Sequence, residues 1–157
     1  MLSIRALTNS DQDWLQARAA DVFNGEIIVS KGVAHTISKL PGFIAEDAGV
    51  AVGIAVYSLQ NQCELVSISA FIQWRGVGSA LIAAVEQAAR DAGLSRIWLV
   101  TTNDNVDAMR FYQKRGYRMK AVYPSALTQS RKLKPQIPLT GNYGITMSDE
   151  IEFEKTL

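Results

Sequence analysis

The sequence contains very few of the residues that bind metals or act as nucleophiles. Its 157 residues include one cysteine, Cys63, and one histidine, His35. Unless a second chain contributes, these two residues cannot form a disulfide, a zinc finger, a two-histidine metal site or a Cys-His pair. We therefore expect no metal site. If the protein is an enzyme, a borrowed cofactor should carry the reactive group.

An excess of charge and a long hydrophobic segment are also missing. Lys and Arg number 16 and Asp and Glu number 15, so the net charge of +1 creates no global field that favours nucleic acid or an anionic membrane. The longest apolar stretch, residues 48–57, is too short to span a bilayer, and the N-terminus lacks the pattern of a secretion signal. We expect one domain over residues 1–157 that is cytoplasmic and binds neither nucleic acid nor membrane.

Strand and helix patterns alternate along the chain. Residues 77–92 carry apolar side chains at three- and four-residue steps, which is typical of one helix face, and Gly93 ends the pattern. With the strands expected on either side, this helix forms a βαβ unit with parallel strands. Strands are expected at 2–7, 43–46, 51–59, 64–72, 96–102, 117–123 and 150–156, and helices at 10–25, 77–92, 105–115 and 125–134. Residues 25–42 give no clear pattern. The fold class is therefore α/β (α+β).

A glycine-containing loop joins the first strand of the βαβ unit to its helix, with the sequence Gln73-Trp74-Arg75-Gly76-Val77-Gly78-Ser79-Ala80. Glycines let the backbone approach a ligand, and the first turn of the helix offers unpaired N–H groups, so the loop suits phosphate or pyrophosphate. A tight turn with glycines for packing alone is the alternative. A Walker loop would need Lys after a glycine, and a Rossmann fingerprint would need glycine where Leu81 stands.

A second motif begins the helix after the βαβ unit: Asn105, Ala108 three residues on, the aromatic pair Phe111-Tyr112, and Gly116-Tyr117. Together the two motifs resemble the signatures of the GNAT superfamily of acyl-CoA N-acyltransferases. The loop is similar to that family's pyrophosphate loop, which reads Arg or Gln, two residues, Gly, one residue, and Gly or Ala. Ala70 departs from the family, because many members have Pro there. The resemblance covers residues 64–117.

The resemblance implies a mixed central sheet of about six to seven strands, with helices on both faces and a parallel pair that splays apart around acetyl-CoA. Backbone amides from Arg75 to Ala80 would bind the pyrophosphate, where Arg75 either adds charge or is an ordinary solvated side chain. Asn105 is the expected N-cap and would also reach the pantetheine arm. The cofactor-binding residues implied are Ile68, Ala70, Gln73, Trp74, Arg75, Gly76, Val77, Gly78, Ser79, Ala80, Asn105, Ala108 and Tyr112.

Two residues are candidates for proton transfer. Phe111 and Tyr112 point about 100° apart on a helix, so we assign Phe111 to the core and Tyr112 to the cleft, where its hydroxyl would protonate the leaving thiolate. Packing on the cofactor arm is the alternative role of Tyr112. Strand alternation places Glu64 on one face with Ile68 and Ala70, and an apolar face raises a carboxyl pKa, which suits a general base. An equally good alternative is that Glu64 is a solvated side chain or forms a structural salt bridge.

The acceptor is harder to define from sequence. The connection 124–149 and the strand after it would line the acceptor pocket, with Glu150 or Glu152 holding a cationic amine, although a solvated strand edge is the simpler interpretation. We expect acetyl transfer to a small-molecule amine. Acetylation of a protein N-terminus or lysine, and a non-catalytic acyl-CoA sensor, are the alternatives. The protein could also form a homodimer. Trp74 would then contact either the cofactor or the partner chain.

Overall fold

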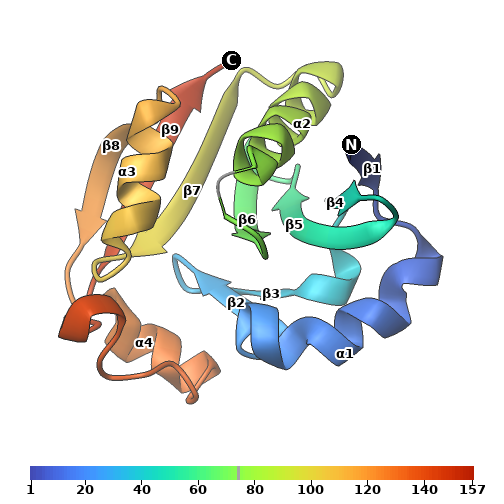
Figure 1. Cartoon of the computed structure of the whole chain (residues 1–157). Coiled ribbons are helices and arrows are strands. Elements are labelled where there is room, and N and C mark those ends of the chain that lie inside the picture. Colours follow the sequence, from blue (N-terminus) through green and yellow to red (C-terminus); the bar gives the residue numbers. More distant parts are fainter. Residues whose placement is uncertain (74) are drawn as a thin grey trace.

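The computed structural model describes residues 1–73 and 75–157, so the expected contact of Trp74 lies outside the described residues. Seven strands form one mixed sheet in the order β1-β4-β5-β6-β7-β9-β8 (Figure 1). The strands are β1 (Leu2–Ala6), β4 (Gly42–Asp47), β5 (Val50–Ser58), β6 (Cys63–Ala70), β7 (Arg96–Thr102), β8 (Arg118–Tyr123) and β9 (Glu150–Thr156). The helices are α1 (Gln12–Phe23), α2 (Val77–Asp91), α3 (Val106–Lys114) and α4 (Ala126–Leu133). The predicted fold class and sheet are confirmed.

The parallel pair of the βαβ unit separates after a short contact. β6 and β7 pair only at Cys63 with Ile97 and at Glu64 with Trp98. Beyond these two positions β7 continues to pair with β9 on its other side, while β6 continues to pair with β5. The two strands therefore diverge toward their carboxyl ends, as the resemblance implied, and ligands of α/β sheets bind at such ends.

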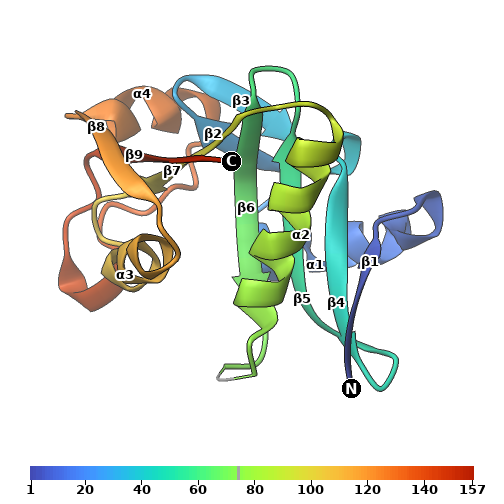
Figure 2. The ribbon, with the colours of Figure 1, turned by 90° about the horizontal axis from the view of Figure 1, so that it is seen from above.

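Helices cover both faces of the sheet. α2 and α3 lie on one face, where Leu81 and Val85 of α2 and Tyr112 of α3 share a core with Phe153 of β9 (Figure 2). α1 packs on the other face through Leu15 and a second apolar cluster. The α2 stripe is buried because its apolar side chains recur on one helix face, as the sequence pattern predicts.

Residues 25–42, which the sequence left unassigned, form a hairpin. β2 (Ile27–Ser30) pairs antiparallel with β3 (Val33–Thr36), and the turn between them is Lys31-Gly32. Both turn residues have positive φ, 49° and 78°, which matches the right-handed twist of a two-residue hairpin. In Figure 1 this hairpin lies below β6, on the side of α1 and α4.

Two further findings concern the ends of elements. The capping box before α1 joins Thr8 and Asp11. The long connection 124–149 contains α4, close to the predicted 125–134 helix. Among the helices of residues 1–73 and 75–157, none is long and apolar enough to cross a membrane.

Candidate functional site

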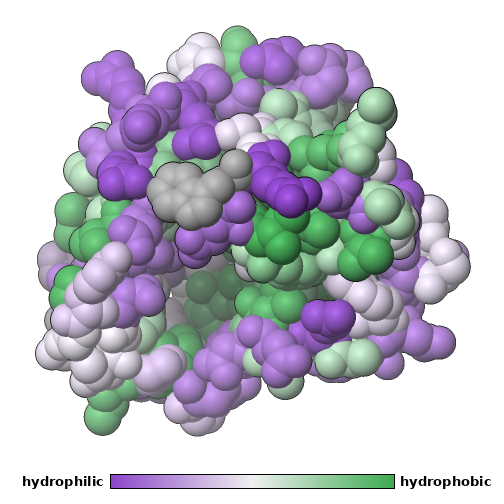
Figure 3. Space-filling view, viewed as in Figure 1, coloured by the Kyte–Doolittle hydropathy of each residue, from purple (hydrophilic) through white to green (hydrophobic). Residues whose placement is uncertain are grey.

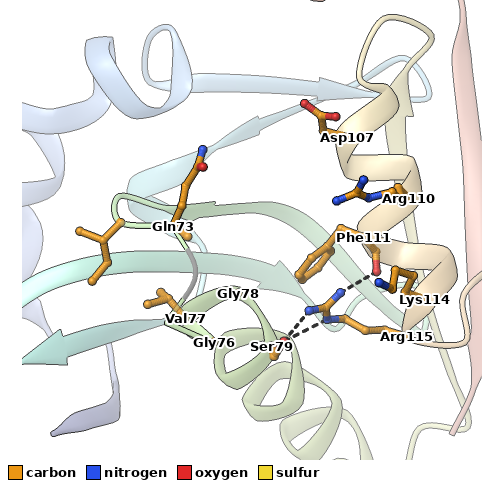
Figure 4. Close-up of a pocket in the computed structure, with 12 residues that line it drawn as sticks. Gln73, Gly76, Val77, Gly78, Ser79, Asp107, Arg110, Phe111, Lys114 and Arg115 are labelled. Carbon is orange, nitrogen blue, oxygen red and sulfur yellow. Dashed lines mark hydrogen bonds between the residues drawn. The ribbon is translucent and has the colours of Figure 1, made fainter.

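The larger cavity of the site lies where the start of α2 faces α3. It has a volume of about 460 Å³, within the range of about 300–1,000 Å³ usual for ligand sites. Figure 4 shows the lining side chains, and Figure 3 shows that this face of the molecule is hollowed near its centre. The lining consists of Ala70, Ile72, Gln73, Gly76, Val77, Gly78, Ser79, Asp107, Arg110, Phe111, Lys114 and Arg115.

Two glycines shape the start of α2. Gly76 is the N-cap and adopts a left-handed conformation with φ of 70°, which a residue with a side chain rarely adopts. A Cβ atom on Gly78 would lie 3.0 Å from the ring of Phe111, so a larger residue would push α2 and α3 apart. The first-turn N–H groups of α2 lack intrahelical acceptors and point, with the positive end of the helix dipole, to the cavity. The glycines thus serve both close packing and access to the backbone.

Three cationic side chains, two from α3 and one from its C-cap residue Arg115, line the same cavity. Arg110 and Lys114 are four residues apart and therefore share one face of the helix. Arg115 donates hydrogen bonds to Ser79 Oγ at 2.5 Å and to the Phe111 carbonyl at 2.9 Å, and its guanidinium lies 3.6 Å from the Phe111 ring centroid. Our sequence reasoning did not identify these cations, although their spacing on the helix was visible.

The chemistry of this lining fits a pyrophosphate. Helix N–H groups and three cations converge on one cavity, while Asp107 is the only acidic residue of its lining among the described residues. Gly76 and Gly78 keep the backbone accessible. A phosphorylated ligand such as coenzyme A would find both hydrogen-bond donors and positive charge here.

The predicted cofactor residues divide into two groups. Ala70, Gln73, Gly76, Val77, Gly78 and Ser79 line the cavity. Arg75 instead forms an ion pair with Asp47 at 3.0 Å and its side chain is 68% exposed, so the solvated interpretation fits its position better. Ile68 and Ala108 pack against the core, and Ala80 closes the first helical hydrogen bond with the Gly76 carbonyl at 2.9 Å.

Asn105 is the N-cap residue of α3, as predicted, but its side chain makes no capping hydrogen bond. Its Nδ2 donates to Thr101 Oγ1 at 3.1 Å. The side chain therefore faces a different, smaller cavity, which it lines together with the end of β7.

The predicted orientations of Phe111 and Tyr112 are wrong. Phe111 lines the larger cavity, where it packs against Gly78. Tyr112 is only 7% exposed, and its ring lies 5.9 Å from that of Tyr117 and 6.0 Å from that of Phe153. Burial raises the pKa of the Tyr112 phenol, so it is a weaker acid than a free tyrosine. The Tyr112 hydroxyl accepts or donates no hydrogen bond among the described residues.

Glu64 lies on a different sheet face from the one predicted. A bulge at Val66, where Val56 pairs with Ser67 and Tyr57 with Leu65, reverses the alternation of β6. Ile68 therefore packs with the α2 side, whereas Glu64 faces the β2–β3 hairpin and lies 3.1 Å from His35 Nε2. Glu64 is 6% exposed, and burial raises its pKa, although Ser30, His35 and Lys31 oppose the shift.

The acids of β9 share one face, as predicted, but they do not form a solvated edge. Glu152 is 1% exposed and accepts hydrogen bonds from Lys31 Nζ at 2.8 Å and Arg96 Nη2 at 2.7 Å. Glu150 is 3% exposed and lines the smaller cavity, which measures about 230 Å³. β9 therefore places one neutralised and one available carboxylate on the side of the β2–β3 hairpin.

Comparisons with known proteins agree with this geometry. The model of the "Acetyltransferase (GNAT) family" matches residues 10–117. The protein YdhI of Bacillus subtilis (strain 168) is 42% identical over 134 residues, which cover 84% of this chain and 83% of that protein.

Two solved structures share the fold. The IAA acetyltransferase from Bacillus cereus has a TM-score of 0.77 at 18% identity, with all of both chains covered. A GNAT family acetyltransferase from Elizabethkingia anophelis, solved with acetyl-CoA bound, has a TM-score of 0.73 at 16% identity, covering 99% of this chain and 98% of that one.

Proposed function

The chain belongs to the acetyltransferase (GNAT) family, and from this premise we propose that it transfers the acetyl group of acetyl-CoA to a primary amine of a small molecule. We propose that residues 1–157 form one N-acetyltransferase domain in which both substrates are bound at once. The observation that carries this proposal is the cavity of about 460 Å³ at the N-terminus of α2, lined by Arg110, Lys114 and Arg115.

Bound acetyl-CoA supplies an acetyl thioester, and the amine nitrogen forms a C–N bond as the C–S bond breaks. The first turn of α2 binds the pyrophosphate through backbone N–H groups, and the cations of α3 add charge. Backbone groups of Ile68 and Ala70 at the diverging end of β6 hold the pantetheine arm. Since ligands reach the carboxyl ends of parallel strands, the divergence of β6 from β7 gives that arm a path toward the core.

Tyr112 is proposed to donate a hydrogen bond to the leaving sulfur, because its ring is buried but its hydroxyl has no partner among the described residues and, unlike Ser30 Oγ, is not fully enclosed. Its pKa is raised by burial, so the phenol stays protonated across the neutral range. Such a group stabilises a developing thiolate mainly by donating a hydrogen bond, because full ionisation of the buried phenol is unfavourable.

Glu64 is the proposed general base. The attacking amine must lose one proton, and a buried carboxylate with a raised pKa accepts it near neutral pH more readily than an exposed one. His35, 3.1 Å away and partly exposed, gives that proton a route toward solvent. The proton count is then balanced: a neutral amine passes one proton through Glu64 and His35 to solvent, and the thiolate, held by the Tyr112 hydrogen bond, takes one proton from solvent as it leaves.

The small cavity near Glu150 supports a small-molecule acceptor. Its volume of about 230 Å³, bordered by β2, β7 and α4, matches a small amine rather than a long peptide segment. This supports the small-molecule interpretation over acetylation of a protein.

The test is thiol release from acetyl-CoA in the presence of a panel of primary amines, followed by mass spectrometry of the acceptor. We expect amine-dependent release of coenzyme A and an acetylated amine. Tight acetyl-CoA binding without turnover on any amine, and without any effect of Tyr112→Phe, would instead favour a non-catalytic acyl-CoA sensor.

A further inference from the structure

The smaller cavity combines aliphatic walls with a few polar groups and one carboxylate. It lies between the β2–β3 hairpin, the carboxyl end of β7 and the α4 segment, and α3 borders it through Asn105. Because α3 also lines the larger cavity through Phe111 and Arg110, the two cavities border the same helix. The aliphatic lining consists of Ile28, Val29, Val100, Leu127 and Ile137, and the polar lining consists of Thr101, Thr102, Asn105, Lys134 and Glu150.

The carboxylate of Glu150 is buried but poorly satisfied. It is 3% exposed, and its one hydrogen bond from the described residues is a long one, 3.4 Å from the Lys31 backbone N–H to Oε2. Oε1 accepts none from those residues. Within that part of the chain, Ser30 Oγ is the one fully enclosed side-chain polar atom without a partner, so the free oxygen of Glu150 borders open space. Buried carboxylates normally have hydrogen bonds or an ion pair that offset the loss of hydration, and Glu150 has only one long hydrogen bond.

The nearby cations are committed to other groups. Lys31 Nζ binds Glu152, and Arg96 binds Glu152 and Glu154. Lys134 lines the same cavity, but its Nζ donates to the Phe23 carbonyl at 2.8 Å. Among the ion pairs of the described residues, none includes Glu150.

A second buried carboxylate adds to the negative potential. Burial raises the pKa of Glu150, and the charge of Glu64 raises it further. Only His35 pairs with Glu64 among the described residues. Two desolvated carboxylates that repel each other are both stabilised by one bound cation.

We propose that this cavity selects the acceptor: an amine with a small apolar body, whose ammonium group is held by Glu150 while the aliphatic walls bind the body. The inference rests on the proposed acetyl transfer and names its substrate class. Polar or anionic amines, such as glycine or aspartate, fit these walls and this charge poorly. The ammonium held by Glu150 must lose one proton before its nitrogen can attack and a second as the C–N bond forms. Both pass through Glu64 and His35 to solvent, and the leaving thiolate regains one from solvent.

The experiment compares hexylamine and phenethylamine with glycine, and hexylamine with its uncharged isostere hexanol. Thiol release gives kcat and KM, and calorimetric titration of the protein with coenzyme A present gives binding without turnover. The variant is Glu150→Gln. The matched control is Glu154→Gln on the same strand face, whose side chain pairs at the surface with Arg96 and Lys120.

We expect hexylamine and phenethylamine to exceed glycine in kcat/KM, and Glu150→Gln to raise the KM or Kd for hexylamine by at least about tenfold, as loss of a charged hydrogen bond predicts. Hexanol binding and acetyl-CoA binding should not change, and Glu154→Gln should behave as wild type. Equal hexylamine binding by Glu150→Gln and wild type, or a preference for glycine, would overturn the inference.

The titration also separates this inference from the proposed function. Hexylamine binding that depends on Glu150, without acetyl transfer, would leave the cavity assignment intact and refute the transfer. Acetyl transfer to amines without any dependence on Glu150 would support the transferase function and refute the assignment of the smaller cavity.

Discussion

His35 Nε2 lies 3.1 Å from Glu64 Oε1, so the one histidine of the chain is hydrogen-bonded to a buried carboxylate of the central sheet. The two residues come from different layers, since His35 belongs to the β2–β3 hairpin and Glu64 to β6. Their side chains are 14% and 8% exposed. The contact therefore joins the central sheet to the β2–β3 hairpin.

Glu64→Gln should remove the acidic limb of the pH–rate profile. A base must be deprotonated, and burial raises the pKa of Glu64, so the wild-type rate should fall as pH drops through a midpoint above the ordinary glutamate range. Ser30, His35 and Lys31 from the hairpin and Glu150 from β9 act on this group. Glu64→Gln should lower kcat about 100-fold at neutral pH.

The stability of Glu64→Gln is the control for that measurement. A carboxyl whose folded pKa is raised favours folding most at low pH, and this contribution is lost as pH rises through the folded pKa. Replacing it by an uncharged amide should therefore not lower the free energy of unfolding at neutral pH by more than the His35 hydrogen bond, about 1–3 kcal/mol. An unchanged pH–rate profile in a folded variant would exclude Glu64 as the base.

Tyr112→Phe should reduce kcat by at least about 100-fold while acetyl-CoA binding and stability are kept. Its hydroxyl makes no hydrogen bond to the described residues, so its loss leaves no partner unsatisfied. Tyr117→Phe is the matched control, because the Tyr117 hydroxyl donates to the buried Glu86 at 2.9 Å. That variant should lose about 1–3 kcal/mol of stability with little direct effect on kcat. Full activity in Tyr112→Phe would contradict the assignment.

Charge reversal in the larger cavity should weaken acetyl-CoA binding. Arg110→Glu and Lys114→Glu each replace attraction for phosphate by repulsion, and each should raise the Kd at least about tenfold, with a smaller effect at high salt. The control is Lys132→Glu, because Lys132 is an exposed residue of α4 that does not line the cavity. Equal acetyl-CoA titrations for all three variants would place the phosphates elsewhere.

Gly78→Val should also block the cofactor. The added Cβ would lie 3.0 Å from the Phe111 ring, and the branched side chain would fill the first turn of α2. Ala83→Val tests the same β-branched substitution on the exposed part of that helix. We expect the Gly78 variant to lose its thermal shift with acetyl-CoA and the Ala83 variant to keep it. Equal shifts would show that close approach at Gly78 is unnecessary for binding.

Most elements of the fold could be predicted because their patterns are long and local. The sequence predicts β7 and β9 with the bounds observed, and it predicts α2, from its apolar face, with bounds that differ by one residue. The hairpin at Lys31-Gly32 was missed, because its strands are only four residues each and its turn relies on a lysine with positive φ. Such a turn carries a weaker signal than the usual Asn-Gly.

The site was predicted in its backbone parts and less well in its side chains. The glycine loop depends on local chain geometry, and the structure brings Gly76 and Gly78 to the cavity. Which of Phe111 and Tyr112 faces the core depends on how α3 is rotated against β9, and which face Glu64 takes depends on the bulge at Val66. Both are set by tertiary packing, which periodicity alone does not encode.

The most direct test of the account is thermal unfolding of the native protein titrated with acetyl-CoA. Ligand at about 100 times its Kd should add about 2.7 kcal/mol to the free energy of unfolding, which raises Tm on the order of 5–10 °C for a chain of this size. We predict that shift in the wild type and a shift reduced by about half or more in Arg110→Glu at the same acetyl-CoA concentration. No shift with acetyl-CoA in the wild type would contradict the central claim that the cavity between α2 and α3 binds the acetyl donor.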